Sequence, residues 1–205
     1  MSDSRRAHWQ DVYGSKDPTE VSWYQPVPEQ SLQLIRETGV AKSDPVVDVG
    51  GGASTLVDHL LQEGYSDVSV LDISGNALEQ SRARLGKSAD AVDWIETDVT
   101  TFAPPRQYAL WHDRAVFHFL TDPADRDNYV DVSSRAIASN GYLVLATFGP
   151  EGPLRCSGLE IQRYSVQRLR DLLGDHFRLG SHHLEDHLTP MGSTQQFLYS
   201  WWQAR

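Results

Sequence analysis

A run of three glycines, Gly50, Gly51 and Gly52, is the first feature of the sequence that could support chemistry. It follows a short apolar run at 46–49 and precedes residues with helical spacing. Where a strand turns sharply through glycine into a helix, backbone N–H groups are left bare and the helix dipole adds partial positive charge. The stretch 45–58 therefore predicts a turn that binds a small anionic or polar cofactor.

The glycine turn alone does not say which cofactor binds. Gly50 and Gly52 permit the backbone torsions and the close approach that such a turn demands. The dehydrogenase fingerprint G-x-G-x-x-G would need a further glycine at position 55, where this chain has Thr55. The side chains at the other strand ends must therefore decide the nature of the site.

Acidic residues follow the next two apolar runs. Asp72 comes directly after the first of them, and Asp98 comes shortly after the second. A carboxylate at the first place can accept hydrogen bonds from both hydroxyls of a ribose, and its charge would repel a 2′-phosphate. A carboxylate at the second place could accept from an adenine amino group, while Ile73 and Val99 offer apolar faces to the ring.

Polar residues also end the following run, in the order His112, Asp113, Arg114. In an open parallel sheet, ligands bind outside the carboxyl ends of the strands, so polar groups at four successive ends predict one coherent site. These three residues are the candidates for a catalytic role. For Asp113 and Arg114, a structural ion pair at the strand end is an equally good interpretation.

These residues need a scaffold that brings strand ends together, and the rest of the sequence predicts one. Apolar runs alternate with segments of helical spacing from residue 45 onward. The predicted strands are 46–49, 68–71, 91–95, 108–112, 142–146, 177–187 and 195–202. The predicted helices are 8–13, 29–38, 54–64, 74–86, 125–138 and 165–173. Such alternation predicts an α/β fold, with parallel βαβ units and helices on both faces of the sheet.

The length of 205 residues predicts a single domain over 1–205. Within it, we interpret 1–44 as an N-terminal helical and aromatic cap segment and 45–205 as the cofactor-binding core. The formal net charge of −10 argues against nucleic-acid binding. The single cysteine, Cys156, excludes an internal disulfide or a Cys-based zinc site. No signal peptide or membrane-length apolar run is present, so we expect a soluble, cytoplasmic protein.

The motifs at these strand ends resemble those of the class I S-adenosylmethionine-dependent methyltransferases. The segments that carry the resemblance are 47–54, 71–74, 97–99, 110–114 and 141–145, within a similarity that spans about 9–202. The resemblance implies a three-layer αβα sandwich with a Rossmann-like, seven-stranded, mostly parallel sheet whose last strand is antiparallel. Ser54 departs from the family, which commonly has a third glycine there. The run 112–118 also resembles a small bacterial subgroup related to thiopurine-type and protein-lysine methyltransferases.

The resemblance implies S-adenosylmethionine as cofactor and S-adenosylhomocysteine as product. Asp48 and the glycine turn would hold the methionine end, Asp72 the ribose and Asp98 the adenine, with His112 near the sulfonium. The implied cofactor residues are Asp48, Val49, Gly50, Gly51, Gly52, Ser54, Asp72, Ile73, Asp98, Val99, His112 and Trp23. Methyl transfer needs mainly alignment and desolvation, with a base only if the nucleophile arrives protonated.

The acceptor is expected to be a small molecule, with a protein lysine as the alternative. The candidate acceptor residues are Trp9, Tyr13, Tyr24, Arg114, Arg155, Arg163 and Tyr164. The aromatic residues of the cap segment either attach it to the core or form a lid that excludes water and faces a cationic methyl group. A non-catalytic regulatory protein that binds S-adenosylmethionine stays open, while Thr55 and Asp98 disfavour an NAD(P)-dependent oxidoreductase. The acceptor atom, oligomeric state and pathway stay open.

The remaining histidines favour structural interpretations. His118 lies among apolar residues, so we favour a packing role over that of a base. His183, Glu185 and His187 would share one strand face with metal-ligand chemistry, but solvated edge residues are the better interpretation, and no metal is expected. Cys156 is expected to be a structural thiol.

Overall fold

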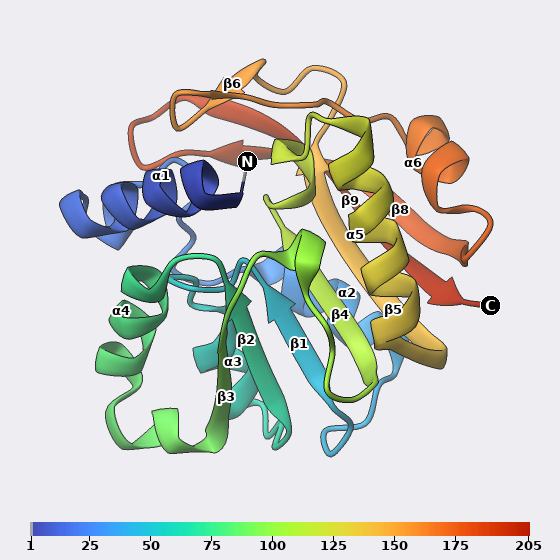
Figure 1. Cartoon of the computed structure of the whole chain (residues 1–205), viewed down its shortest axis with the longest axis horizontal. Helices are drawn as coiled ribbons and strands as arrows, with labels where there is room; N and C mark the ends of the chain where they lie inside the picture. The colour runs from blue at the N-terminus through green and yellow to red at the C-terminus, as the bar shows by residue number, and fades with distance from the viewer. Residues whose placement is uncertain (1) are drawn as a thin grey trace.

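A seven-stranded sheet forms the centre of the structure, a computed structural model that describes residues 2–205 (Figure 1). The strand order is β3-β2-β1-β4-β5-β9-β8. The strands are β1 Val46–Val49, β2 Val68–Asp72, β3 Val92–Glu96, β4 Tyr108–Arg114, β5 Ile137–Phe148, β8 Phe177–Leu188 and β9 Thr194–Ala204. The first five are parallel, and β9 is antiparallel to both of its neighbours. The predicted mostly parallel sheet with an antiparallel last strand is confirmed.

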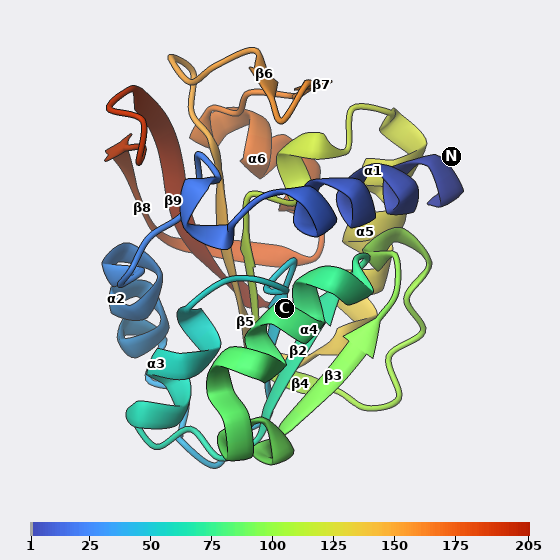
Figure 2. The same ribbon diagram turned by 90° about the vertical axis from the view of Figure 1, so that its left-hand side faces the viewer.

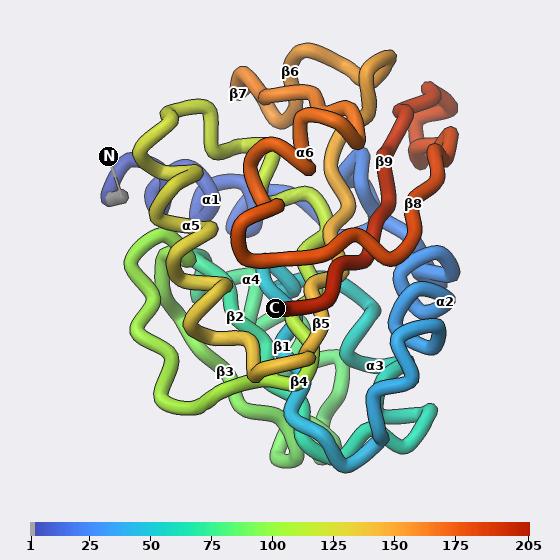
Figure 3. Tube along the Cα trace, turned by 90° about the vertical axis from the view of Figure 1, so that its right-hand side faces the viewer, coloured from blue at the N-terminus to red at the C-terminus, as the bar shows by residue number. Residues whose placement is uncertain are grey.

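Helices cover both faces of this sheet. The α-helices are α1 Ser2–Ser15, α2 Glu29–Thr38, α3 Leu56–Gln62, α4 Gly75–Leu85, α5 Pro123–Ala136 and α6 Val166–Leu173. The short elements are η1 Pro18–Glu20, η2 Gly86–Ala91, η3 Val99–Thr101, η4 Phe117–Phe119, β6 Arg155–Cys156 and β7 Leu159–Glu160. Helices α2, α3 and α4 lie on one face (Figure 2), and α5 and α6 lie on the other (Figure 3).

The central strands β1 and β2 are mostly apolar and are buried along their whole length, because both of their faces are covered. Successive side chains point to opposite faces, so Val46 packs with α2 and α3 in one hydrophobic cluster, while Val47 packs with α5 and α6 in another. The sheet thus separates two cores. His112 and Arg114, two residues apart on β4, lie on the α2 and α3 side, and Asp113 lies on the opposite side.

Several predicted boundaries are wrong. The helix predicted at 8–13 extends over Ser2–Ser15. The prediction was too short because most of α1 is polar and lacks the apolar spacing that would mark its ends. The helix predicted to run to residue 138 stops at Ala136, and β5 begins immediately afterwards. Asn140, just beyond the predicted end of that helix, lies inside β5 with a φ of 62°, at an irregularity in its pairing with β4.

Helix α1 lies across the carboxyl ends of the strands and beside α4 (Figure 2). The side chain of Gln10 accepts from the backbone N–H of Asn76, and Asn76 donates to the carbonyl of Gln10, each at 3.0 Å. Gln80 of α4 donates to the carbonyl of Tyr13. The helix is therefore fixed over the sheet by polar bonds to α4. Within residues 2–205, no helix has the length and apolarity that crossing a membrane requires.

Candidate functional site

A cavity lies where the carboxyl ends of the strands meet α1. Its walls come from the loops after β1, β2, β3 and β4, from α1 and from residues 18–31. The predicted cofactor residues that line it are Asp48, Val49, Gly50, Gly51, Ser54, Asp72, Ile73, Asp98, Val99, His112 and Trp23. The predicted acceptor residues that line it are Trp9, Tyr13, Tyr24 and Arg114. The predicted cofactor residues and these predicted acceptor residues thus line the same cavity.

The glycine turn is packed too tightly for side chains. Gly50 has a φ of +68°, and a Cβ on it would lie 2.0 Å from Cγ2 of Val116. A Cβ on Gly51 would lie 2.3 Å from Oδ2 of Asp48, and one on Gly52 would lie 2.5 Å from Cβ of Ala77. These contacts explain why the turn needs glycine: it must pass between the strand-end carboxylates and the loop after β4.

The expectation of bare N–H groups at this turn is wrong for three of its residues. The N–H of Gly50 donates to the carbonyl of Leu71 at 2.7 Å, and that of Ser54 to Gly51 at 3.0 Å. The N–H of Gly52 donates to Oδ2 of Asp72, also at 3.0 Å. Helix α3 begins only at Leu56, later than predicted. The turn therefore contributes shape and holds a carboxylate, rather than presenting a row of free donors.

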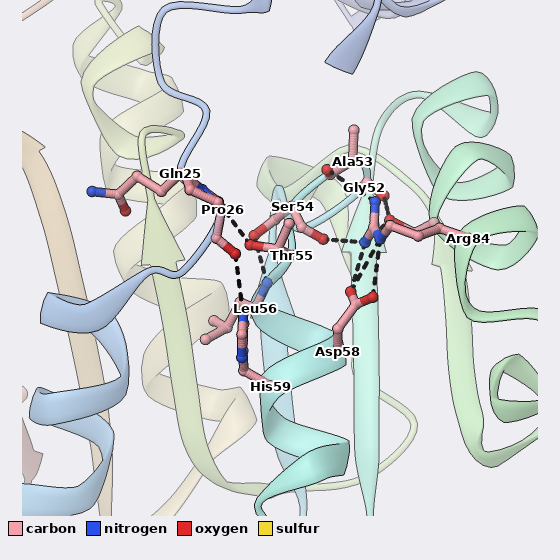
Figure 4. Close-up of polar contacts among 11 residues, drawn as sticks. Gln25, Pro26, Gly52, Ala53, Ser54, Thr55, Leu56, Asp58, His59 and Arg84 are labelled. Atoms are coloured by element: carbon pink, nitrogen blue, oxygen red, sulfur yellow. Dashed lines mark hydrogen bonds and ion pairs between the residues drawn. The ribbon is translucent and has the colours of Figure 1, made fainter. Parts of the chain in front are cut away.

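Arg84 and residues of the cap segment brace the turn (Figure 4). Arg84 reaches across from α4 and donates to the carbonyls of Ala53 and Ser54, and it forms an ion pair with Asp58 of α3 at 2.7 Å. On the other side, Thr55 donates to the carbonyl of Gln25 at 2.9 Å, which ties the turn to the cap segment. The turn is thus fixed from both sides.

A buried chain of three polar side chains links β1, β4 and α2. Oδ1 of Asp48 accepts from Nδ1 of His112 at 2.7 Å, and Nε2 of the same ring shares a hydrogen bond with the hydroxyl of Ser31 at 2.9 Å. All three residues are almost completely buried, which suits a bracing role better than that of an exposed nucleophile. Oδ2 of Asp48 is buried without a hydrogen-bond partner. A donor entering the cavity at this point would satisfy it.

Asp72 is held by backbone donors at the end of β2. Its Oδ2 accepts from the N–H of Gly52 at 3.0 Å, and its Oδ1 accepts from the N–H of Ser74 at 2.8 Å. Burial, with a smaller contribution from the charge of Asp48, raises the pKa of Asp72 to about 6 despite the lowering effect of the backbone N–H donors. The carboxylate is therefore oriented in advance and titrates close to neutral pH.

Asp98 already has partners from both sides. Its Oδ1 accepts from the N–H of Thr100 at 2.9 Å, and its Oδ2 forms an ion pair with Arg5 of α1 at 3.1 Å. Arg5 also pairs with Asp125 at 2.9 Å. The place where an adenine amino group was expected is thus reached by an arginine of the cap segment, a contact that the sequence did not predict.

Asp113 and Arg114 separate onto opposite faces of the sheet, so the ion pair considered for them does not form. Asp113 lies outside the cavity lining and accepts from the hydroxyl of Tyr129 at 2.7 Å and from the N–H of Val116 at 3.0 Å. Burial raises its pKa to about 6. Arg114 faces the cavity, and its Nε donates to the hydroxyl of Tyr199 at 2.8 Å.

Aromatic rings close the cavity from the side of the cap segment. Trp9 meets Phe119 with 5.0 Å between ring centres and Trp23 with 5.8 Å, both edge to face. Tyr13 meets Trp23 at 6.4 Å. Because these residues come from α1, from residues 18–31 and from η4, their meeting in space depends on the whole fold.

Three predicted acceptor residues lie outside the cavity lining. Arg155 and Arg163 each donate to a backbone carbonyl near their own loop. Tyr164 is completely buried in the core beside Phe117, and burial raises its pKa to about 12. They surround the loop after β5 without facing the site.

The other histidines have structural partners. Burial lowers the pKa of His118 to about 3, and its Nδ1 accepts from the N–H of Phe148 at 3.2 Å, so it is a neutral packing residue. His183 bonds to Gln30, and Nε2 of His187 donates to the carbonyl of Ser22. Among residues 2–205, no three metal-ligand side chains come together.

Sequence reasoning missed Ser31, Arg5 and Phe119 in the lining. Ser31 had a usable signal, because it is a polar residue on the same helical face as the buried Ile35 and Thr38 of α2. Arg5 and Phe119 had none, since their roles depend on how α1 and the loop after β4 meet.

Comparison with known proteins finds a family profile that matches part of the chain and solved structures that share its fold. A family profile described as "Methyltransferase domain" matches residues 47–143, from β1 into β5. An N-methyltransferase, NodS, from Bradyrhizobium japonicum is similar with a TM-score of 0.74 and 14% identity over 97% of this chain and 98% of that one. Its structure contains S-adenosyl-L-homocysteine.

Two further solved structures share the architecture. A SAM-dependent methyltransferase from Anabaena variabilis has a TM-score of 0.76 and 16% identity over 100% of this chain and 95% of that one. A 1,6-didemethyltoxoflavin-N1-methyltransferase from Burkholderia thailandensis has a TM-score of 0.72 and 16% identity over 98% and 84%. At such identities the likeness is one of fold. No curated protein matches the chain.

Proposed function

We propose that this chain is a class I S-adenosylmethionine-dependent methyltransferase and that it transfers a methyl group from this cofactor to a small-molecule acceptor; the methyltransferase-domain profile over residues 47–143 and the shared fold support this. The observation that carries the proposal is the cavity itself. Three carboxylates, those of Asp48, Asp72 and Asp98, face it from three adjacent strand ends around the glycine turn. Such a set of acceptors suits a ligand that offers an ammonium group, ribose hydroxyls and an adenine amino group.

The residues fit the cofactor S-adenosylmethionine one part at a time. The unpartnered, buried Oδ2 of Asp48 needs a donor, and the ammonium of the methionine end is one. Asp72, oriented by two backbone N–H groups, would accept from the ribose. Asp98 would take the adenine end, with Ile73 and Val99 against the ring. We retain these assignments as proposals for the individual residues.

The cofactor, when bound, supplies a methyl group on a positively charged sulfur; the acceptor bonds to that carbon while the electron pair of the C–S bond stays on sulfur, giving S-adenosylhomocysteine. The chain contributes alignment and exclusion of water. Asp48, His112 and Ser31 form a buried brace that fixes the floor of the cavity. Trp9 and Trp23 cover it. A base is needed only for an acceptor that arrives protonated.

A small acceptor is favoured because α1 and its aromatic residues cover the cavity. A protein side chain would have to enter past Trp9 and Tyr13, which line the cavity from α1. A protein lysine is the second candidate acceptor, and a non-catalytic regulator that binds the cofactor is the alternative outside enzymes. We further propose that residues 1–44 and 45–205 act as cap and core of a single domain.

An NAD-dependent oxidoreductase is disfavoured by charge. A pyrophosphate is recognised by backbone donors at a glycine turn, whereas three N–H groups of this turn are already bonded within the protein. The carboxylates around it would repel such an anion.

Calorimetry with S-adenosylmethionine, S-adenosylhomocysteine and NAD tests the cofactor, and formation of S-adenosylhomocysteine with a panel of acceptors tests turnover. We expect both sulfur compounds to bind and NAD not to bind. Binding of NAD alone would refute the proposal. Binding of S-adenosylmethionine without turnover on any small acceptor or protein would favour the regulatory alternative.

A further inference from the structure

Arg114 is the cationic residue at the β4 end of the cavity. Because Arg114, Ala146 and Tyr199 are in register on β4, β5 and β9, its side chain crosses the small Ala146 to reach the next strand. Nε donates to the hydroxyl of Tyr199 at 2.8 Å, and Nη1 donates to the carbonyl of Trp23 at 2.7 Å. The guanidinium lies 4.8 Å from the centre of the Phe197 ring. Neutral groups therefore hold it in one place.

No carboxylate of residues 2–205 forms an ion pair with Arg114. Its Nη2 is buried and has no hydrogen-bond partner. A guanidinium has five N–H donors, and the two bonds to Tyr199 and Trp23 leave the others for a ligand. Glu185 acts on Tyr199, whose pKa burial raises and Glu185 raises further, but it forms no ion pair with the guanidinium. Because Arg114 is half-buried and has no ion-pair partner, an anionic ligand in the cavity would be attracted to its free donors.

The two histidines near Arg114 do not compete with it as a cation at this end of the cavity. Burial, with the charge of Arg114 added, lowers the pKa of His118 to about 3 and also lowers the pKa of His187. Both imidazoles are therefore neutral near pH 7. Three aromatic residues, Trp9, Trp23 and Phe119, line the same cavity and offer flat apolar walls.

We propose that Arg114 binds the carboxylate of an aromatic or similarly flat acid, and that this acid is the methyl acceptor. The inference rests on the proposed function, since it assigns the substrate class of the same site. A planar guanidinium matches a carboxylate in shape and charge, and the flat apolar walls suit a planar acid. The acceptor's negative charge also offsets the repulsion between the guanidinium and the positively charged sulfur that the cofactor brings.

The test uses calorimetry on the full chain. S-adenosylhomocysteine is added to saturation, and the complex is titrated with indole-3-acetate and benzoate and with the matching neutral amides. We expect the carboxylates to bind at least about tenfold more tightly than their amides, the ratio that one charge-assisted hydrogen bond supplies. Equal binding of acids and amides, or binding of neither, would overturn the inference and leave the proposed function intact.

Variants of two arginines localise the effect. Arg114→Met should weaken carboxylate binding about 10- to 100-fold, with little effect on the amides. Arg155→Met is the matched control, because Arg155 is exposed and lies outside the cavity lining, and it should change neither. Binding of S-adenosylhomocysteine to Arg114→Met shows that the variant is folded.

The same variant separates acceptor from cofactor. If Arg114→Met weakens S-adenosylhomocysteine but not 5′-methylthioadenosine, which lacks the amino-acid end, Arg114 holds the cofactor's own carboxylate and the inference is wrong. If the wild-type protein does not bind S-adenosylhomocysteine at all, the proposed function fails instead. We expect the dissociation constants of both cofactor analogues for Arg114→Met to stay within about twofold of those for the wild type, because the substitution removes no contact with the cofactor.

Discussion

Gly50 meets two separate conditions, a left-handed backbone and a space too small for a methyl group. Its φ is +68°, and an added Cβ would lie 2.0 Å from Cγ2 of Val116. An alanine in this conformation costs roughly 1–2 kcal/mol before the clash is counted. We therefore expect Gly50→Ala to lower the free energy of unfolding by about 2–4 kcal/mol in urea titrations, with binding of S-adenosylhomocysteine reduced at least tenfold.

Gly64 provides the matched control for this prediction. Its φ is +88°, but a Cβ there would have nothing within 4 Å. Gly64→Ala should therefore show the conformational cost alone and leave ligand affinity unchanged. Equal effects of the two substitutions on binding would mean that the packing of Val116 against the turn is irrelevant to the site.

We expect Asp72 to make binding of the cofactor sensitive to pH. Burial raises its pKa to about 6 in the ligand-free protein. The ionised carboxylate is the form that accepts from ribose hydroxyls, so below that pH a bound proton must leave before the ligand binds. Affinity for S-adenosylhomocysteine should hardly change from pH 7 to pH 6 and should fall by up to tenfold per unit below about pH 6. Calorimetry between pH 5 and pH 7 measures this directly.

Asp113 also has a pKa of about 6, so the source of the pH dependence must be identified. Asp72→Asn should weaken binding by about 1.5–3 kcal/mol at pH 7 and give an affinity that no longer varies over this range. If the slope persists in Asp72→Asn, Asp113 or another group carries it, and the ribose assignment loses its support.

Among the elements, α1 is the one whose removal should affect the site without affecting the sheet. Neither of the two large hydrophobic clusters contains a residue of α1, whose Tyr13 belongs to a small cluster with Ala53 and Ala77. Deleting residues 2–15 should leave a cooperative unfolding transition and weaken S-adenosylhomocysteine about 10- to 100-fold, since burial of one large side chain is worth about 1.5–3 kcal/mol. Calorimetry and thermal unfolding test both parts.

Arg6 serves as the control within α1. It pairs with Glu96 at 2.7 Å, and both side chains are substantially exposed, whereas its neighbour Arg5 lines the cavity. Arg6→Ala should change little, because an exposed ion pair is worth at most about 1 kcal/mol. Unchanged affinity after the deletion of α1 would leave the helix with a packing role only.

At the scale of the molecule, the sheet could be predicted from the sequence, whereas the contacts of the cap segment with the sheet could not. Buried parallel strands are continuous apolar runs that end in turn residues, so β1, β2 and β4 were recognisable one at a time. Asp72 at the end of β2 and Asp98 just before η3 were predictable for the same reason, because each comes directly or shortly after such a run. A local sequence pattern is sufficient to predict such strands because each one is a single continuous run of mostly apolar residues.

The parts that escaped prediction depend on contacts between distant segments. The ion pair of Arg5 with Asp98 joins residues 93 positions apart, and Ser31 meets His112 across 81 positions. The opposite orientations of Asp113 and Arg114 follow from strand alternation, which was available, but the partners that decide their roles, Tyr129 and Tyr199, were not. The end of the cavity around Arg114 is built mostly from such contacts between distant segments.

The position of α1 over the cavity has a consequence for the order and timing of catalysis. Because Trp9 and Tyr13 line the cavity from α1, we expect movement of this helix away from α4 to control how fast a bound ligand leaves. Steady-state turnover would then be limited by the departure of S-adenosylhomocysteine, and a burst of methylated product would precede the slower steady rate.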